Sequence, residues 1–280
     1  AAQVMQDRWR RIEREGFARA LYPPSCRLCG CPADGDACAV HRLELAETRA
    51  RCGLCSLPLA AGIGGPGAWP AAPWESSGVG RRRTSWRRCR SCRTQAPGFG
   101  RLLALGDYPG ELRPWVLALK SAPRPGLVEL LAGLLAGRMS TAGWTGTADE
   151  PLALVPVPSH HLRRWERGLE PVEQLARSLA PRVGGRLVRA LVRRRQTPRQ
   201  GEPGSGSRSA NVVGAFGLAR PHWQGVGRVG PRVVLVDDVC GSGSTLSECA
   251  RELRRAGVER VGALVLGVGS RARRQAGGSP

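Results

Sequence analysis

The stretch RVVLVDDVCGSGSTL, residues 232–246, decides the fold. It begins with an apolar run, reaches two adjacent acids at Asp237 and Asp238, and continues through glycine and hydroxyl residues into a helical pattern. A short, continuous apolar run is typical of a strand that is covered on both faces of a sheet. The stretch therefore predicts a buried strand, a tight loop and a helix in immediate succession.

The loop in this stretch has the composition of a phosphate-binding site. Successive backbone N–H groups, together with the N-terminus of the following helix, can hold a phosphate. Glycines allow the backbone to approach the ligand closely, and serine and threonine add hydroxyl donors. The residues that we assign to phosphate binding are Cys240, Gly241, Ser242, Gly243, Ser244 and Thr245.

The two acids predict that the ligand is a sugar phosphate. Asp237 and Asp238 are the last residues of the strand predicted at 232–238, and open α/β sheets bind their ligands at this carboxyl end. Their carboxylates can hold two ribose hydroxyls, directly or through Mg²⁺. An ordinary strand–turn–helix is the alternative, but two acids beside a buried strand are costly without a partner. The loop matches neither a Walker A motif nor G-x-G-x-x-G, and Cys240 and Cys249 are interpreted as packing residues.

The remaining elements predict a parallel sheet with helices on both faces. Apolar runs indicate strands at 102–108, 152–158 and 261–267, and helical spacing is found at 111–120, 126–139, 171–179 and 246–256. The polar, glycine-rich stretch 196–206 is expected to be a loop. Strands that alternate with helices are typical of the α/β class.

The composition favours polyanionic partners. The 280 residues include 43 Lys+Arg against 22 Asp+Glu, for a formal net charge of +21, and Lys120 is the single lysine. Such an excess suits phosphates or nucleic acid. Neither a membrane span nor the apolar core of a signal peptide is present in the sequence, so we expect a cytoplasmic location.

Eight of the ten cysteines lie between Cys26 and Cys92 and indicate structural zinc. A C-x-x-C turn presents two thiolates to one tetrahedral ion, and the sequence contains four pairs of ligands at this spacing. Taken in order, they predict one zinc bound by Cys26, Cys29, Cys38 and His41, and a second bound by Cys52, Cys55, Cys89 and Cys92. A crossed pairing stays open, as does a single ion, and the spare Cys31 could replace a ligand. Free thiols and disulfides are the alternatives to zinc.

Four regions are expected along the chain. A helix at 1–25 precedes a double zinc ribbon at 26–98, which contains a disordered Gly/Pro/Ala-rich insertion at 58–80. The α/β domain follows at 99–270, and a disordered tail occupies 271–280. The basic run RRRTSWRR at 81–88 suits contact with phosphates and stacking on bases, or is a solvated loop.

With these motifs placed, residues 232–246 resemble the phosphoribosyl pyrophosphate (PRPP) signature of type I phosphoribosyltransferases. The whole chain is similar to the ComF family, phosphoribosyltransferase-like proteins that are linked to competence for DNA uptake. The matching segments are LYPPSCRLCG at 21–30, YPGEL at 108–112 with Leu119-Lys120, VPVPSHHLRRWERGLEPVEQLA at 155–176, and TPRQ to AF at 197–216. Two departures stand out: Leu169-Glu170-Pro171 where the family reads Phe-Asn-Gln, and Gly241 where a threonine is usual.

The resemblance implies a type I phosphoribosyltransferase-like fold and Mg²⁺–PRPP as the ligand. It implies a pyrophosphate loop that contains Arg163, Arg164, Arg167 and Gly168, and a mobile loop that contains Gln200, Arg208 and Asn211. Two functions follow. One is transfer of phosphoribosyl to a nitrogenous base that the sequence does not identify. The other is non-catalytic binding of single-stranded DNA, alongside proteins of the competence machinery.

Overall fold

The computed structural model describes residues 25, 26, 33, 38, 51–57, 88–109, 112–121, 124–158, 170–195, 212–219 and 230–269. The chain divides into two compact units, residues 1–46 and 47–280, and the second contains the sheet and its helices. The helix predicted at 1–25, the insertion at 58–80 and the tail at 271–280 lie outside the described residues, apart from Ser25.

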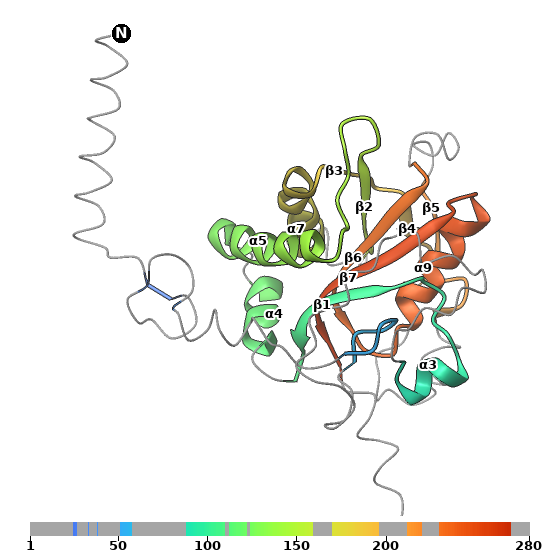
Figure 1. Ribbon diagram of the computed structural model, residues 1–280, viewed down its shortest axis with the longest axis horizontal. Coiled ribbons are helices and arrows are strands. Elements are labelled where there is room, and N and C mark those ends of the chain that lie inside the picture. The colour runs from blue at the N-terminus through green and yellow to red at the C-terminus, as the bar shows by residue number, and fades with distance from the viewer. Residues whose placement is uncertain are drawn as a thin grey trace, which may run out of the picture. The chain divides into compact units, whose positions relative to one another are not determined.

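Five parallel strands form the central sheet in the order β1-β7-β6-β2-β3 (Figure 1). The strands are β1 Leu102–Asp107, β2 Leu152–Pro156, β3 Gly185–Leu187, β6 Arg232–Cys240 and β7 Arg260–Val268. In the register of β6, Val234 lies opposite Leu154 of β2 on one side and Gly262 of β7 on the other. The strand that carries the two acids is therefore the middle strand of the sheet, and the predicted parallel sheet is confirmed.

Helices cover both faces of this sheet, as predicted. Figure 1 shows α4, α5 and α7 to one side and α9 to the other. Their bounds are α4 Leu112–Ser121, α5 Pro125–Thr141, α7 Pro171–Leu179 and α9 Ser244–Arg255, with a 3-10 turn η2 at Ala180–Val183 and a short α3 at Arg90–Thr94. Across the described ranges, every helix is too short or too polar to cross a membrane.

Alternate strand residues pack against the two helical layers, as the period of a strand requires. Val233 and Leu235 share one buried cluster with Leu246 and Leu253 of α9. Val234, between them, is equally buried and lies on the other face. The strand is thus apolar on both faces until Asp237, so the polar part of β6 is confined to its carboxyl end.

A small antiparallel hairpin, β4 Leu191–Arg193 with β5 Phe216–Leu218, packs against α9. It was not predicted, because three-residue strands are too short to show an alternating pattern. The two strands flank the stretch 196–211.

Candidate functional site

The phosphate loop, residues 240–245, runs from the last residue of β6 into the first turn of α9. Gly243 is the N-cap of α9 and has φ 77°, a conformation that favours glycine. The Ser242 and Ser244 hydroxyls lie 2.9 Å apart, and the Ser244 N–H donates to Ser242 Oγ at 3.3 Å. The first N–H groups of a helix have no intrahelical acceptor, so this loop suits an anion.

The two acids are linked to each other and to a lysine. Lys120 Nζ, in the last turn of α4, lies 2.8 Å from Asp238 Oδ2. The Asp238 N–H donates to Asp237 Oδ1 at 2.8 Å. Burial, followed by the charge of Asp238, raises the pKa of Asp237 to about 8. The Lys120 ammonium therefore lies where it offsets negative charge on the pair.

A second cation acts on Asp237 from the β4–β5 side of the sheet. Burial lowers the pKa of Arg193, and the charges of Cys249, Asp237 and Glu170 act in the opposite direction. Glu170, directly before α7, also contributes to the raised pKa of Asp237. The acid of the Glu170-Pro171 departure thus acts electrostatically on the acid pair and increases the negative potential there.

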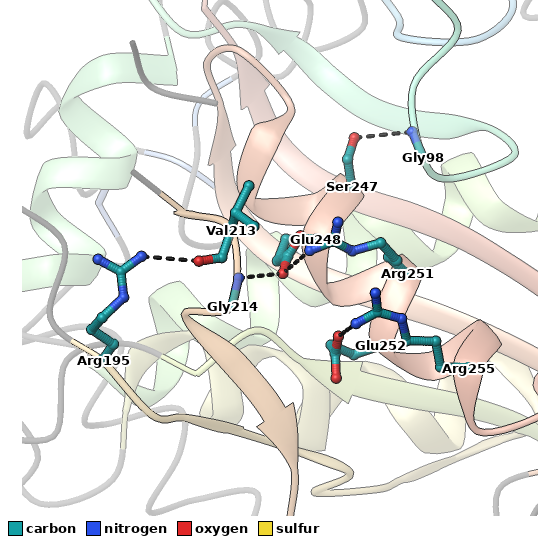
Figure 2. A network of polar contacts seen from close by, with 9 residues as sticks. All are labelled: Gly98, Arg195, Val213, Gly214, Ser247, Glu248, Arg251, Glu252 and Arg255. Carbon is teal, nitrogen blue, oxygen red and sulfur yellow. Dashed lines mark hydrogen bonds and ion pairs between the residues drawn. The ribbon is translucent and has the colours of Figure 1, made fainter. Parts of the chain in front are cut away.

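Glu248 of α9 anchors the chain beside the hairpin (Figure 2). Its side chain is 5% exposed and accepts the Gly214 N–H at 2.7 Å. Arg251, one turn further along α9, pairs with the same carboxylate. Arg195 donates to the Val213 carbonyl at 2.9 Å, so polar contacts hold both ends of the stretch 196–211. Glu248 therefore connects the helix of the phosphate loop to the segment that follows this stretch.

Four cysteine sulfurs converge elsewhere in the same unit. The sulfurs of Cys52, Cys55, Cys89 and Cys92 all lie within 4.8 Å of one another. The Sγ atoms of Cys55 and Cys89 are 3.6 Å apart. Sulfurs placed about 2.3 Å from one tetrahedral ion stand roughly 3.8 Å apart. The cluster is compatible with a structural zinc, and it has the four members predicted for the second site.

The four thiols shift one another's pKa values through hydrogen bonds, and this arrangement of sulfurs also suits a cation. Hydrogen bonds from Cys55 and Cys92 lower the pKa of Cys52, and the bond to Cys52 raises the pKa of Cys55. The bond to Cys52 also raises the pKa of Cys92 to about 12. One thiolate is satisfied by its neighbours, whereas four thiolates together need a positive ion. Four sulfur donors are the set that Zn²⁺ prefers.

The segment that contains Cys52 and Cys55 is bound to β1 by hydrogen bonds and an ion pair. Arg51, whose side chain is 2% exposed, lies 2.8 Å from Asp107 and donates to the Ser56 carbonyl at 2.9 Å. The Leu102 N–H donates to the Leu54 carbonyl at 2.8 Å, and the Ser56 hydroxyl donates to the Leu102 carbonyl. The four-cysteine cluster is therefore packed on the α/β sheet itself.

A cavity of about 740 Å³ lies beside the phosphate loop. Cys55 and Cys92 contribute to its wall on the cysteine side, and Gly241 and Ser244 contribute on the loop side. Three arginines of α9 also line it, namely Arg251, Arg254 and Arg255. The volume is in the range that holds a small organic ligand.

The structure brings together part of the predicted site. Asp237, Asp238 and the six residues of the phosphate loop form one continuous group at the end of β6. Cys26 and Cys38 of the predicted first zinc site are buried. Cys29, His41 and the predicted loop residues Arg163, Arg164, Arg167, Gly168, Gln200, Arg208 and Asn211 lie outside the described residues.

Three residues were not predicted as site residues: Lys120 and Arg193, which act on the acids, and Glu248 of α9. Arg193 and Glu248 gave no signal, because an isolated charged residue in a polar stretch is unremarkable in a sequence. Lys120 did give one: it is the single lysine among 43 basic residues. Its proximity to Asp238 depends on the packing of α4 beside the sheet, which sequence patterns do not specify.

Comparisons with known proteins agree with this arrangement. The Phosphoribosyl transferase domain family matches residues 166–276. Competence protein F of Haemophilus influenzae is 31% identical over 174 residues, covering 62% of this chain and 75% of that protein. The chain belongs to the ComF/YhgH family.

Two further members match, one of them over a longer stretch. DNA utilization protein YhgH of Salmonella typhimurium is 28% identical over 243 residues, covering 85% of this chain and 94% of that protein. The protein of the same name from Escherichia coli (strain K12) is 30% identical over 174 residues, which is 74% of its length. The predicted family and the phosphoribosyltransferase-like α/β fold are thereby confirmed.

Proposed function

We propose that this ComF/YhgH family member binds PRPP, or a related ribose 5-phosphate ligand, at the carboxyl end of β6 and transfers its phosphoribosyl group to a nitrogenous base. The observation that carries the proposal is the continuous arrangement of two acids, a glycine-capped loop and a helix N-terminus on the middle strand of a parallel sheet. This is the place where open α/β sheets bind ligands.

Each group has a role that its chemistry supports. The N–H groups and hydroxyls of the phosphate loop would hold the 5-phosphate. Asp237 and Asp238 would hold the two ribose hydroxyls, directly or through Mg²⁺, for which carboxylate oxygens are suitable donors. When bound, Mg²⁺ would offset the charge of the departing pyrophosphate. In the transfer, the bond from C1 to pyrophosphate breaks, a bond from C1 to the base nitrogen forms, and the proton of that nitrogen is released to water.

The residues predicted for the pyrophosphate end belong to this proposal. Arg163, Arg164, Arg167 and Gly168 would hold the leaving pyrophosphate, since cationic groups stabilise the charge that develops there. Gln200, Arg208 and Asn211 would contact the ligand from the stretch that begins after Arg195. Glu170 beside the acids would weaken the affinity for a pyrophosphate.

Calorimetry tests the proposal directly. Mg²⁺–PRPP is titrated into zinc-loaded protein and into a double variant, Asp237→Asn with Asp238→Asn. We expect saturable binding to the wild type and a loss of affinity of at least about tenfold in the variant. Asp149→Asn is the matched control, because Asp149 is an exposed acid before the amino end of β2. A folded wild type that does not bind PRPP would sink the proposal.

A second function, binding of single-stranded DNA, is favoured by charge. The chain carries a formal net charge of +21, and three arginines of α9 line the cavity beside the phosphate loop. The names of the relatives also mention competence and DNA utilization. This function would bring in partners from the competence machinery.

Salt dependence separates the two functions. DNA held by several cationic contacts should lose affinity steeply as salt rises. The logarithm of its binding constant should fall linearly with the logarithm of the salt concentration. The affinity for Mg²⁺–PRPP in a preformed site should respond less to salt. Fluorescence anisotropy with a labelled oligonucleotide, beside calorimetry with PRPP at the same salt concentrations, makes the comparison.

A further inference from the structure

Lys120 is the one basic residue in the chain that is not an arginine. It lies in the last turn of α4, and the buried side chains of this helix fix its position: Leu112, Trp115, Val116 and Leu119 are all 2% exposed or less. The Lys120 side chain is 42% exposed, yet its Nζ lies 2.8 Å from Asp238 Oδ2, which belongs to a side chain that is 18% exposed. The ammonium is therefore placed at the acid pair and is still accessible to a ligand.

The difference between lysine and arginine matters at this position. A guanidinium is a rigid, planar fork that binds a carboxylate with two parallel hydrogen bonds. An ammonium is a compact point charge on a flexible stem, and it can rotate from one anion to another. An arginine would hold Asp238 more firmly than a lysine, which suits a permanent ion pair but hinders a carboxylate that must also bind a sugar hydroxyl.

The surroundings show why Asp238 needs a cation when the site is empty. Asp237 is directly adjacent, and Glu170 before α7 adds negative charge that acts on Asp237. Arg193 of β4 and the Cys249 thiol of α9 act electrostatically on Asp237. Among the described residues, the recorded ion pair of Asp238 is the one with Lys120.

We propose that Lys120 is a positioning residue that holds Asp238 in place in the unliganded protein and moves to an anionic group of the ligand when a ribose hydroxyl takes its place on Asp238. The inference rests on the proposed function, because it requires a phosphoribosyl ligand at this site. It explains why the chain has a lysine here and arginine at every other basic position.

Calorimetry with Mg²⁺–PRPP on the variant Lys120→Arg tests whether the side chain must leave Asp238 when the ligand binds. Charge is retained, but the guanidinium competes with the ribose hydroxyl for Asp238, so we expect the affinity to fall by about tenfold. Lys120→Met, which lacks the charge, should weaken binding at least as much. Arg113→Lys is the matched control, since it makes the reverse exchange at an exposed position of α4 and should bind like the wild type. Wild-type affinity in Lys120→Arg or Lys120→Met would overturn the inference.

A spectroscopic measurement tests, without PRPP, whether Lys120 holds Asp238 in the unliganded protein. Protein labelled with ¹⁵N-lysine should give one side-chain Nζ signal, because the chain contains one lysine. We expect Asp238→Asn to shift this signal in the unliganded protein and Asp149→Asn to leave it unchanged. Addition of Mg²⁺–PRPP to the wild type should shift it again.

The two measurements also separate failure of this inference from failure of the proposed function. An Nζ signal that does not shift in Asp238→Asn would overturn the role of Lys120, and PRPP binding by the protein would be unaffected by that result. A wild type that does not bind PRPP would instead remove the proposed function, and with it the movement of Lys120 to a ligand.

Discussion

At the scale of single residues, Asp237 and Asp238 are neighbours in the chain with different surroundings. Asp238 pairs with Lys120 of α4 at 2.8 Å. Asp237 lies among the groups between β6 and α9, where burial raises its pKa to about 8. Adjacent strand residues point to opposite faces of a sheet, so each acid meets a different helical layer. The two acids thus differ in kind: Asp238 is paired with a cation, whereas burial favours the protonated form of Asp237.

This protonation makes stability depend on pH in an unusual direction. The pKa of Asp237 is about 8 in the folded chain, against an ordinary value of 3.8. Between these values the folded state holds more protons than the unfolded state, so the free energy of unfolding falls as pH rises, by up to about 1.4 kcal/mol per pH unit. Urea unfolding at about pH 6 and about pH 7.5 should show this fall in the wild type and a smaller fall in Asp237→Asn. Asp149→Asn should keep the wild-type dependence, and an unchanged slope in Asp237→Asn would contradict the assignment.

At the scale of elements, α9 combines two tasks. Its first turn carries Ser244 and Thr245 of the phosphate loop, and Glu248 one turn later binds the Gly214 N–H at 2.7 Å. Ser247, between them, accepts the Gly98 N–H at 3.0 Å (Figure 2). The helix therefore holds the phosphate loop in register with the segments on both of its sides.

Glu248→Ala should lower the stability of the fold. It leaves the Gly214 N–H and the Arg251 guanidinium without their buried carboxylate, at a cost of about 1–3 kcal/mol. Glu252→Ala is the matched control one turn further along α9. Glu252 has its recorded ion pair with Arg255, whose side chain is 64% exposed, so its loss should cost less than about 1 kcal/mol. Chemical unfolding of both variants makes the comparison, and equal costs would show that Glu248 is not an anchor.

Most elements of the sheet and its helices could be predicted, because their patterns are local. The apolar run before Asp237 predicted β6. The helical spacing of apolar residues that begins at Pro171 predicted α7 with the observed bounds. The hairpin β4–β5 could not be predicted, since three residues show no period. The acids and the phosphate loop were visible as a motif, whereas Lys120 and Glu248 join the site through contacts between segments distant in the chain.

At the scale of the whole unit, the four-cysteine cluster and the α/β sheet share one packed body. The predicted ligand set Cys52, Cys55, Cys89 and Cys92 meets in space, although 34 positions separate Cys55 from Cys89. Arg51 and Ser56 then fasten this cluster to β1. Metal binding here should accordingly contribute to the stability of the sheet as well as of the cysteine segment.

Loss of the metal should therefore destabilise the whole unit. Cys92→Ser, or treatment with a chelator, should lower the thermal midpoint by on the order of 10 °C. Ser91→Ala, in the same short helix α3, is the matched control and should change it little. Differential scanning calorimetry, with zinc content measured on the same samples, tests this. A chelated protein with an unchanged midpoint would show that the cluster binds no structural ion.

The contact between the first cysteine segment and β1 has a consequence for solubility. β1 is one of the two edge strands of the sheet, and Leu54 and Ser56 occupy the backbone groups of Leu102 on its outer side. An outer strand with free N–H and C=O groups invites a second chain to pair with it. If loss of a metal from the cluster released this segment, the backbone groups of Leu102 would become free to pair with a second chain, and we expect such chains to self-associate more readily.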